Sequence, residues 1–316
     1  RLLCPSAVFM REGKVCQSCM GKTFATPAIQ HGCYRESRAA SAVVAGMLAW
    51  HKLRGTWQKD VDIFFTPTEF AREKYIEGGF PADRILVKPN CVDPDPGVGD
   101  GSGGYAVFVG RLAPEKGIET LLSAWRRLGD SIPLKIVGDG PLAPVVQDAC
   151  KNSQTIEWLG ELSHREALDE IGRATMLVMP SRWYETFGRA IIEAYAKGTP
   201  VIASNLGAMA DLILPEKTGL LFEPSNGQQL AQCVRRLADS TLTPMRINAR
   251  LEYEKRFTSK ASYESLMNIY DRALETVAGR SLMRTGRGDA APPVGGAVAI
   301  GQDPAIAQVN LDNQTS

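Results

Sequence analysis

A pair of carboxylates, Glu185 and Glu193, encloses a seven-residue stretch that begins Thr186-Phe187-Gly188. A helix that starts near Phe187 or Gly188 presents unpaired N–H groups and the positive end of its dipole, which both favour an anion. Gly188 has no Cβ, so a phosphate can approach the backbone closely there. Glu185 lies just before the helix start and can accept hydrogen bonds from sugar hydroxyls. Glu193 lies nearly two turns inside and can reach the vicinal hydroxyls of a ribose.

Two cations, Arg111 and Lys116, stand upstream on a turn that follows an apolar run and precedes another helix start at Gly117. They would neutralise a pyrophosphate through charge-assisted hydrogen bonds worth about 1.5–3 kcal/mol each. Either motif alone is also typical of charges on a solvated surface. Both follow buried-type strands in one domain-sized stretch, and together they predict a pocket for a sugar nucleotide.

Strands and helices alternate from residue 105 onwards, which predicts an α/β fold with a parallel sheet covered on both faces. We expect strands over 105–109, 133–137, 155–159, 175–179, 200–203 and 219–222, and closing helices over 243–256 and 259–277. Upstream we expect a helix over 36–57 that ends near Gly55, a strand over 61–66, a helix capped by Thr68 and a strand over 85–88. Residues 93–104 are dense in Pro, Gly and Asp and read as a linker. From residue 278 the chain lacks periodicity and is expected to be a disordered tail.

Six motifs between residues 105 and 277 resemble the retaining, nucleotide-sugar-dependent glycosyltransferases of family four. They are Val109-Gly110-Arg111-Leu112 with Glu115-Lys116-Gly117, Ile136 to Leu142, Leu159 to Ser163, Pro180-Ser181 with Glu185 to Glu193, Lys197 to Ala203, and Thr218 to Phe222. The resemblance implies two Rossmann-like domains of the GT-B type.

The resemblance also implies domain limits. Residues 1–92 would be part of an acceptor-side domain with a cysteine-rich loop, and residues 105–258 the nucleotide-sugar-binding domain. A helix over 259–277 would cross back to the first domain. That first domain lacks its usual opening units, so we expect roughly one hundred further residues before residue 1.

Roles for single residues follow from the same resemblance. Arg111 and Lys116 would bind the donor diphosphate and Glu185 the donor sugar, and these three form the expected catalytic set. Glu193 would hold the ribose, and Leu159 to Leu162 would lie near the base. Besides Arg111, Lys116, Glu185 and Glu193, the expected donor-binding residues are Gly110, Gly138, Leu159, Leu162, Thr186, Phe187 and Gly188. No catalytic metal is implied, since cations and the helix N-terminus would stabilise the leaving diphosphate.

The predicted activity is therefore transfer of a sugar from a nucleoside-diphosphate donor to a glycan or lipid-linked acceptor, with polysaccharide or glycolipid synthesis in the cytoplasm as the expected setting. One alternative is a nucleotide-binding fragment without transferase activity; another is a sugar-nucleotide hydrolase or epimerase. A third is a nicotinamide-dependent dehydrogenase, because Gly138-Asp139-Gly140 and Ala143 fit a G-x-G-x-x-A fingerprint. Its acidic partner would be Glu157, which falls inside a strand, so the sugar-nucleotide motifs outweigh this fingerprint.

Four cysteines, Cys4, Cys16, Cys19 and Cys33, are spaced C-x11-C-x2-C-x13-C in an irregular segment. This pattern fits a tetrahedral structural zinc site that would order a loop with few apolar anchors. It equally fits four reduced thiols in a cytosolic protein. The sequence leaves both open.

Composition limits the classes of partner. With 316 residues, 44% hydrophobic and 22% charged, the chain can bury a large core. Its net charge of +1 argues against nucleic acid as the main partner, and no apolar run of about 18 residues predicts a membrane-spanning helix. The helix expected over 36–57 combines Arg38, Lys52 and Arg54 with Met47 and Trp50. It is either a peripheral membrane helix or a core helix with a basic C-terminal end.

Overall fold

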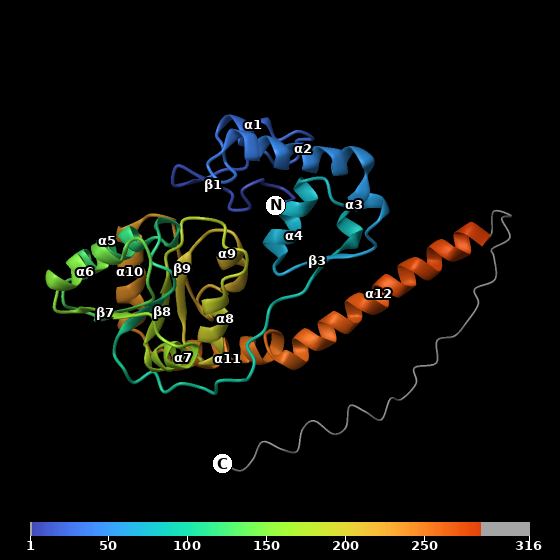
Figure 1. The fold of residues 1–316 in the computed structure, drawn as a ribbon. Helices are drawn as coiled ribbons and strands as arrows, with labels where there is room; N and C mark the ends of the chain where they lie inside the picture. Colours follow the sequence, from blue (N-terminus) through green and yellow to red (C-terminus); the bar gives the residue numbers. More distant parts are fainter. Residues whose placement is uncertain (1, 286–316) are drawn as a thin grey trace, which may run out of the picture. The chain divides into compact units, whose positions relative to one another are not determined.

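The computed structural model describes residues 2–285 (Figure 1). Residues 1–274 form one compact unit, and a second unit spans residues 275–316. The predicted tail lies outside the described residues from position 286 onwards. Residues 278–285 instead continue the last helix, α12 (Ser259–Thr285), in line with the helix propensity of Leu282, Met283 and Arg284. The division into two domains with a linker at 93–104 stays a prediction.

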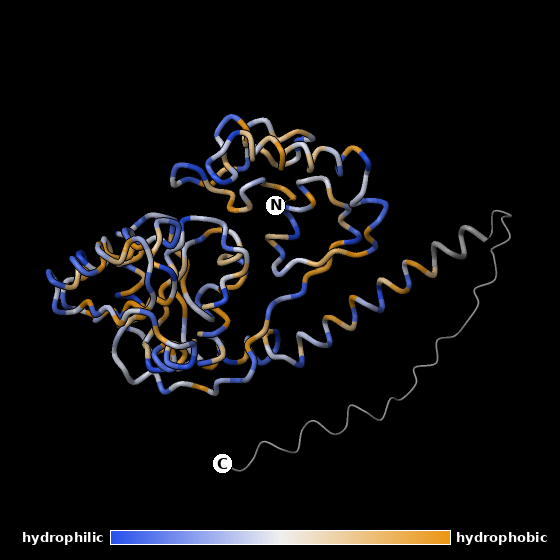
Figure 2. Tube along the Cα trace, viewed as in Figure 1, coloured by the Kyte–Doolittle hydropathy of each residue, from blue (hydrophilic) through white to orange (hydrophobic). Residues whose placement is uncertain are grey.

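A six-stranded parallel sheet organises the chain after residue 105. In order across the sheet its strands are β10 (Gly219–Phe222), β9 (Val201–Ser204), β8 (Met176–Met179), β5 (Ala106–Val109), β6 (Leu134–Val137) and β7 (Ile156–Gly160). The strands are short apolar runs, and Figure 2 shows hydrophobic residues along them. An all-parallel sheet requires cover on both faces. The predicted α/β class with a helix-covered parallel sheet is confirmed.

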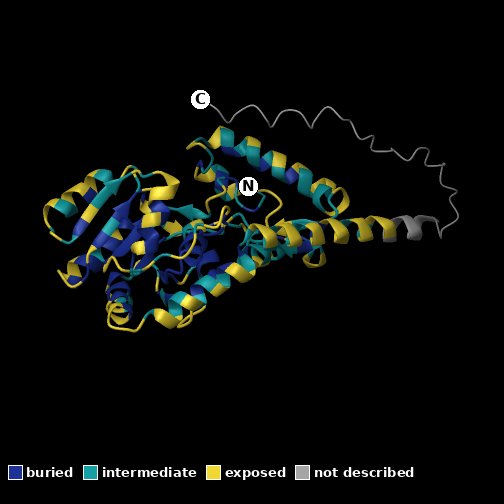
Figure 3. Cartoon of the chain, turned by 90° about the horizontal axis from the view of Figure 1, so that it is seen from below, coloured by how far each residue is buried: buried dark blue, intermediate teal, exposed yellow. Residues whose placement is uncertain are grey.

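Alternate residues of a strand point to opposite faces of the sheet, and helices cover both of these faces. Ala106 and Phe108 of β5 join one buried cluster with α5 (Ile118–Leu128) and α10 (Gly227–Ala238). Val107 joins the other with α8 (Arg189–Ala196) and α11 (Thr243–Arg256). Figure 3 shows buried residues gathered in this layered region. The remaining elements here are η2 (Pro114–Lys116), α6 (Ala143–Lys151), α7 (His164–Arg173) and α9 (Ala208–Leu212).

Smaller elements make up residues 2–92. They are β1 (Met10–Arg11), β2 (Lys14–Val15), α1 (Thr26–Gln30), α2 (Arg38–Arg54), α3 (Thr56–Lys59), β3 (Phe64–Thr66), α4 (Glu69–Glu77), η1 (Ala82–Arg84) and β4 (Ile85–Val87). The first two strands pair antiparallel, and β3 pairs with β4 in parallel. Gly55, with a φ of 66°, ends α2 near the position predicted, and the short helix α3 follows it. Thr68 caps α4 by accepting a hydrogen bond from Ala71 N at 3.1 Å, as predicted.

Helix α12 begins beside the end of β4. Lys88 Nζ donates a hydrogen bond to Ser262 Oγ over 2.8 Å, which ties the first turn of the helix to the segment after β4. Its crossing back to a first domain stays a prediction. Within residues 2–285, no helix combines the length and apolarity needed to cross a membrane, α12 included.

Candidate functional site

The two charged motifs lie at the point where the strand order reverses. Arg111 follows β5, and the loop of Glu185 follows β8; these two strands are neighbours, with later strands added on opposite sides. In open α/β sheets, ligands bind in the crevice outside the carboxyl ends of the strands at such a switch point. The fold thus brings together two segments that are about 70 residues apart in the sequence.

Glu185 is the best-anchored carboxylate of this crevice. It is buried, and its Oε1 accepts hydrogen bonds from Lys116 Nζ at 2.7 Å and from Ser181 Oγ at 2.6 Å. In the described part of the chain its Oε2 accepts none. Lys116 also lies over the Trp183 ring, 5.6 Å from the centroid. Arg111 is exposed and its side chain makes no hydrogen bond or ion pair within residues 2–285, so its guanidinium is open to an anion.

Two glycines let the backbones of three loops touch. Gly117 has a φ of 74°, and a Cβ there would lie 1.9 Å from the carbonyl oxygen of Pro180. Gly138, at a φ of 125°, would place a Cβ 2.1 Å from the carbonyl oxygen of Gly110. Only glycine combines this backbone conformation with such an approach. The contact at Gly117 holds the turn of Lys116 against the loop that carries Glu185.

Replacement of Gly117 by alanine is expected to destabilise the protein and weaken nucleotide binding together. The backbone conformation alone costs about 1–3 kcal/mol for a non-glycine residue, and the methyl group must also push Pro180 away. Gly104→Ala is the matched control, because its φ of 68° is similar and an added Cβ meets nothing within 4 Å. Urea unfolding measures the loss of stability in each of the two variants. Equal losses in the two variants would mean that the approach to Pro180 has no effect.

The helix after Glu185 begins slightly later than the sequence predicts. Gly188, with φ 84° and ψ 57°, is the N-cap, and α8 starts at Arg189. The side chain of Phe187 is buried against Phe257, with ring centroids 6.3 Å apart, so only its backbone can face a ligand. Thr186 is exposed. The first turn of α8 keeps the unpaired N–H groups that favour an anion.

Glu193 lies just over one turn into α8 rather than nearly two, because the helix starts later. It is buried, and its Oε1 accepts hydrogen bonds from His164 Nε2 and Arg189 Nε, both at 2.9 Å. His164 opens α7, a few residues after Leu159 at the end of β7 and Leu162 in the following loop, which are both half-buried beside the core. The expected base-side loop therefore adjoins the expected ribose carboxylate.

Sequence reasoning missed the partners that hold the two carboxylates. Ser181 and Arg189 were predicted only as parts of one motif, and His164 was not among the expected site residues. Its position after Ser163, which forms a capping box with Glu166, was the available signal that it begins a helix at this edge of the sheet.

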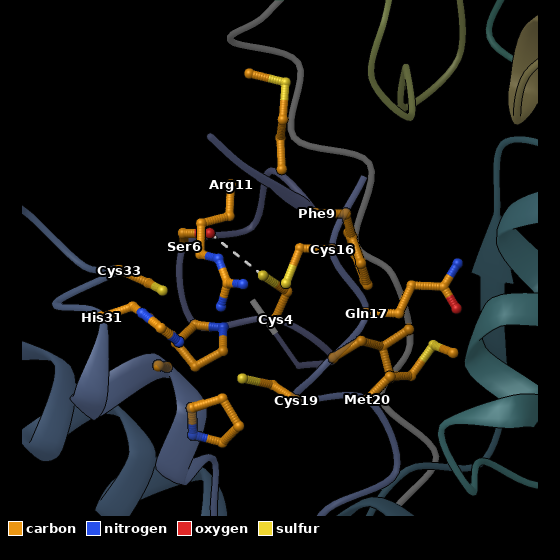
Figure 4. Close-up of a pocket in the computed structure, with 15 residues that line it drawn as sticks. Cys4, Ser6, Phe9, Arg11, Cys16, Gln17, Cys19, Met20, His31 and Cys33 are labelled. Carbon is orange, nitrogen blue, oxygen red and sulfur yellow. Dashed lines mark hydrogen bonds between the residues drawn. The ribbon is translucent and has the colours of Figure 1, made fainter. Parts of the chain in front are cut away.

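The four N-terminal cysteines line one small cavity together with His31 and Arg11 (Figure 4). All four are free thiols. No group of three or more His, Cys, Asp or Glu side chains within residues 2–285 is placed to hold a metal ion, so the structural zinc prediction is not supported.

The surroundings of the thiols shift their pKa values in opposite directions. Burial, and then the neighbouring thiols, raise the pKa of Cys33, and burial likewise raises that of Cys19. A hydrogen bond with Ser18 lowers the pKa of Cys16, and the nearby Arg11 charge lowers it further.

Comparison with known proteins identifies relatives of the part of the chain after residue 99. A family model described as Glycosyl transferases group 1 matches residues 99–260. A 2-deoxystreptamine N-acetyl-D-glucosaminyltransferase from Niallia circulans is 30% identical over 172 residues, which are 52% of this chain and 44% of the relative. A glycogen synthase from Mycobacterium tuberculosis is 33% identical over 146 residues, 44% of this chain and 35% of the relative. The chain thus matches less than half the length of either relative.

Solved structures share the fold. A sucrose-phosphate synthase from Thermosynechococcus elongatus superposes with a TM-score of 0.63 at 23% identity, over 78% of this chain and 66% of that one. HepE from Anabaena in complex with UDP gives a TM-score of 0.59 at 20% identity, over 76% and 67% of the two chains. The chain has the GT-B fold. None of these comparisons favours the dehydrogenase alternative.

Proposed function

Because the chain belongs to the group 1 glycosyltransferases, we propose that it transfers a sugar from a nucleoside-diphosphate donor to a glycan or lipid-linked acceptor. The observation that carries this proposal is the hydrogen-bonded set of Lys116, Ser181 and Glu185 at the switch point of the sheet. Oε1 of Glu185 is held by two donors, so Oε2 is oriented and open to sugar hydroxyls. A cation and a carboxylate side by side suit a ligand that joins a diphosphate to a sugar.

The proposed reaction is retaining and independent of a catalytic metal. Negative charge grows on the diphosphate as the glycosidic bond breaks, and preorganised cations and N–H groups stabilise it. Arg111 and Lys116 supply the cations, and the first turn of α8 supplies N–H groups next to Gly188. Glu185 orients the sugar, and Glu193 binds the ribose. Cytoplasmic polysaccharide or glycolipid synthesis is the proposed setting.

A uridine nucleotide is the first donor class to test, since HepE was solved with UDP. Thermal unfolding of the 316-residue chain with UDP, GDP, ADP and TDP shows which nucleotide binds. A ligand at 100 times its Kd stabilises the folded state by roughly 2.7 kcal/mol. One nucleotide should raise Tm; no shift with any of them would contradict the donor site.

Assays with donor and acceptor separate the remaining alternatives. Transfer by this chain would exclude a nucleotide-binding fragment without activity. Release of free sugar at the same rate with and without acceptor would instead favour a hydrolase, and a change in the donor sugar's configuration would favour an epimerase.

We further propose that α2 lies on an anionic membrane surface. Val43, Met47, Trp50 and Leu53 are spaced to share one face of the helix and are 74%, 49%, 59% and 75% exposed. The helix has no acidic residue, and its last turn is basic. Apolar side chains beside cations are typical of helices that lie in a lipid interface.

Sedimentation with vesicles tests this contact. The chain is expected to bind vesicles that contain phosphatidylglycerol, and Trp50→Glu is expected to weaken that binding. Phe65→Glu, at an exposed aromatic residue on β3, is the control. Binding to neither anionic nor neutral vesicles would contradict the membrane role of α2.

A further inference from the structure

A cavity of about 260 Å³ opens on the side of Glu185 that faces the N-terminal residues. Glu185 and Thr186 form one wall. The other walls come from residues 3–9, from α4 and from Tyr184, and they include the rings of Phe9, Phe70, Tyr75 and Tyr184. A molecule in this cavity would touch the same carboxylate that, under the proposed function, holds the donor sugar.

The cavity walls are aromatic and carry little charge. Lys74 is the one cation in the lining, and its Nζ is already 2.8 Å from the carboxylate of Glu77. Glu185 is the one carboxylate. Recognition of phosphate groups relies on unpaired cations, so this lining does not suit a diphosphate. It suits a neutral ring with an apolar face and hydroxyl groups at its edge.

The size of the cavity points to one ring. Pockets for drug-sized ligands run from about 300 to 1,000 Å³, and this cavity lies just below that range. A single sugar or cyclitol ring fits such a volume, whereas a long isoprenoid chain does not.

Tyr184 lines the cavity, and its side chain is held by several neighbours. Its ring packs 4.7 Å from that of Phe70 and 6.2 Å from that of Phe9, measured between centroids. Its hydroxyl accepts a hydrogen bond from Gln17 Nε2 at 2.6 Å. Gly207 lies so near that an added Cβ would be 3.0 Å from Tyr184 Cδ1. A ring held from three sides loses little entropy when a ligand stacks on it.

The backbone of Phe70 is anchored at the start of α4. Its backbone N–H donates a hydrogen bond to the carboxylate of Asp211 in α9, which ties the start of α4 to the donor half of the chain. The two rings and Glu185 therefore form one preorganised surface.

We propose that this cavity is the acceptor subsite and takes a single neutral sugar or cyclitol ring. The apolar face of the ring stacks on Tyr184 and Phe70, and the reacting hydroxyl points toward Glu185. This assignment rests on the proposed function. In the transfer step the acceptor oxygen bonds to the anomeric carbon, and the bond from that carbon to the diphosphate breaks. The diphosphate keeps the electron pair and receives the hydroxyl proton.

Saturation-transfer NMR on the 316-residue chain with saturating UDP tests the acceptor class. The probes are the methyl glycosides of glucose, galactose, mannose and N-acetylglucosamine, together with myo-inositol. At least one is expected to bind, and farnesyl diphosphate is expected not to displace it. Tyr184→Leu should weaken binding about tenfold, the effect of a 1.4 kcal/mol loss at the upper end for an aromatic contact. Tyr184→Phe, which keeps the ring, should restore it.

Separate outcomes distinguish this proposal from the proposed function. If UDP raises Tm but no ring probe binds, or if Tyr184→Leu binds the ring as well as the wild type, the acceptor assignment is overturned and the donor site stands. If farnesyl diphosphate displaces the ring, the neutral class is wrong. Phe65→Leu is the control, since Phe65 is exposed on β3 outside the cavity. If no nucleotide shifts Tm, the proposed function itself fails.

Discussion

Glu185→Gln is expected to lower kcat by about 10²–10³-fold, the range seen when one preorganised polar contact to a transition state is removed. The glutamine fills the same space but carries no charge. Lys116 Nζ then loses its ion pair at 2.7 Å, and the oriented oxygen that would hold the sugar is no longer a carboxylate. Steady-state kinetics with a nucleotide sugar and an acceptor would measure the loss, and KM for the donor should change much less than kcat.

The alternative for Glu185 is a structural ion pair. Removing one partner of a buried pair costs about 3–5 kcal/mol of stability, and Lys116 would be left without its carboxylate. Unfolding in urea separates the two roles. A large loss of stability with kcat unchanged would place Glu185 outside the reaction. Glu157→Gln, at an exposed carboxylate on β7, controls for the loss of a negative charge from the same sheet.

The sequence predicted the sheet and its helices well, because each strand is a short apolar run between amphipathic helices. The capping signal was also correct, since Thr68 caps α4 as expected. Gly55 ends α2 near the expected position by taking a left-handed conformation. The separate short helix α3 that follows it was not predicted.

The partners of the two carboxylates could not be predicted, since each contact joins distant parts of the chain. Ser181 and Lys116 meet on Glu185 only because β5 and β8 are neighbours. His164 reaches Glu193 across 29 residues, from the start of a different helix. The cysteine spacing left a structural zinc site and four reduced thiols open, and spacing alone cannot say how the side chains are placed. Within residues 2–285 no group of three or more ligands is placed to hold a metal ion.

Glu193→Ala is expected to weaken nucleotide binding about 10- to 100-fold, the loss of one hydrogen bond to a charged group at roughly 1.5–3 kcal/mol. Oε1 of Glu193 is occupied by His164 and Arg189, so Oε2 is the oxygen that would meet the ribose hydroxyls. The side chain is only 9% exposed, which strengthens a charge-assisted hydrogen bond by excluding water. Calorimetric titration with the nucleotide that raises Tm would give both Kd values.

His164→Ala decides whether Glu193 binds the nucleotide or only joins two helices. His164 acts as a positioning residue, because it orients Glu193 and its own side chain is 56% exposed. Its removal should weaken binding by a smaller factor than Glu193→Ala, since Arg189 still holds the carboxylate. A purely structural Glu193 gives a different pattern: both variants would lower Tm, and Kd would stay at the wild-type value. That pattern would remove the ribose assignment and leave the diphosphate and sugar contacts of Lys116 and Glu185 to explain any nucleotide binding.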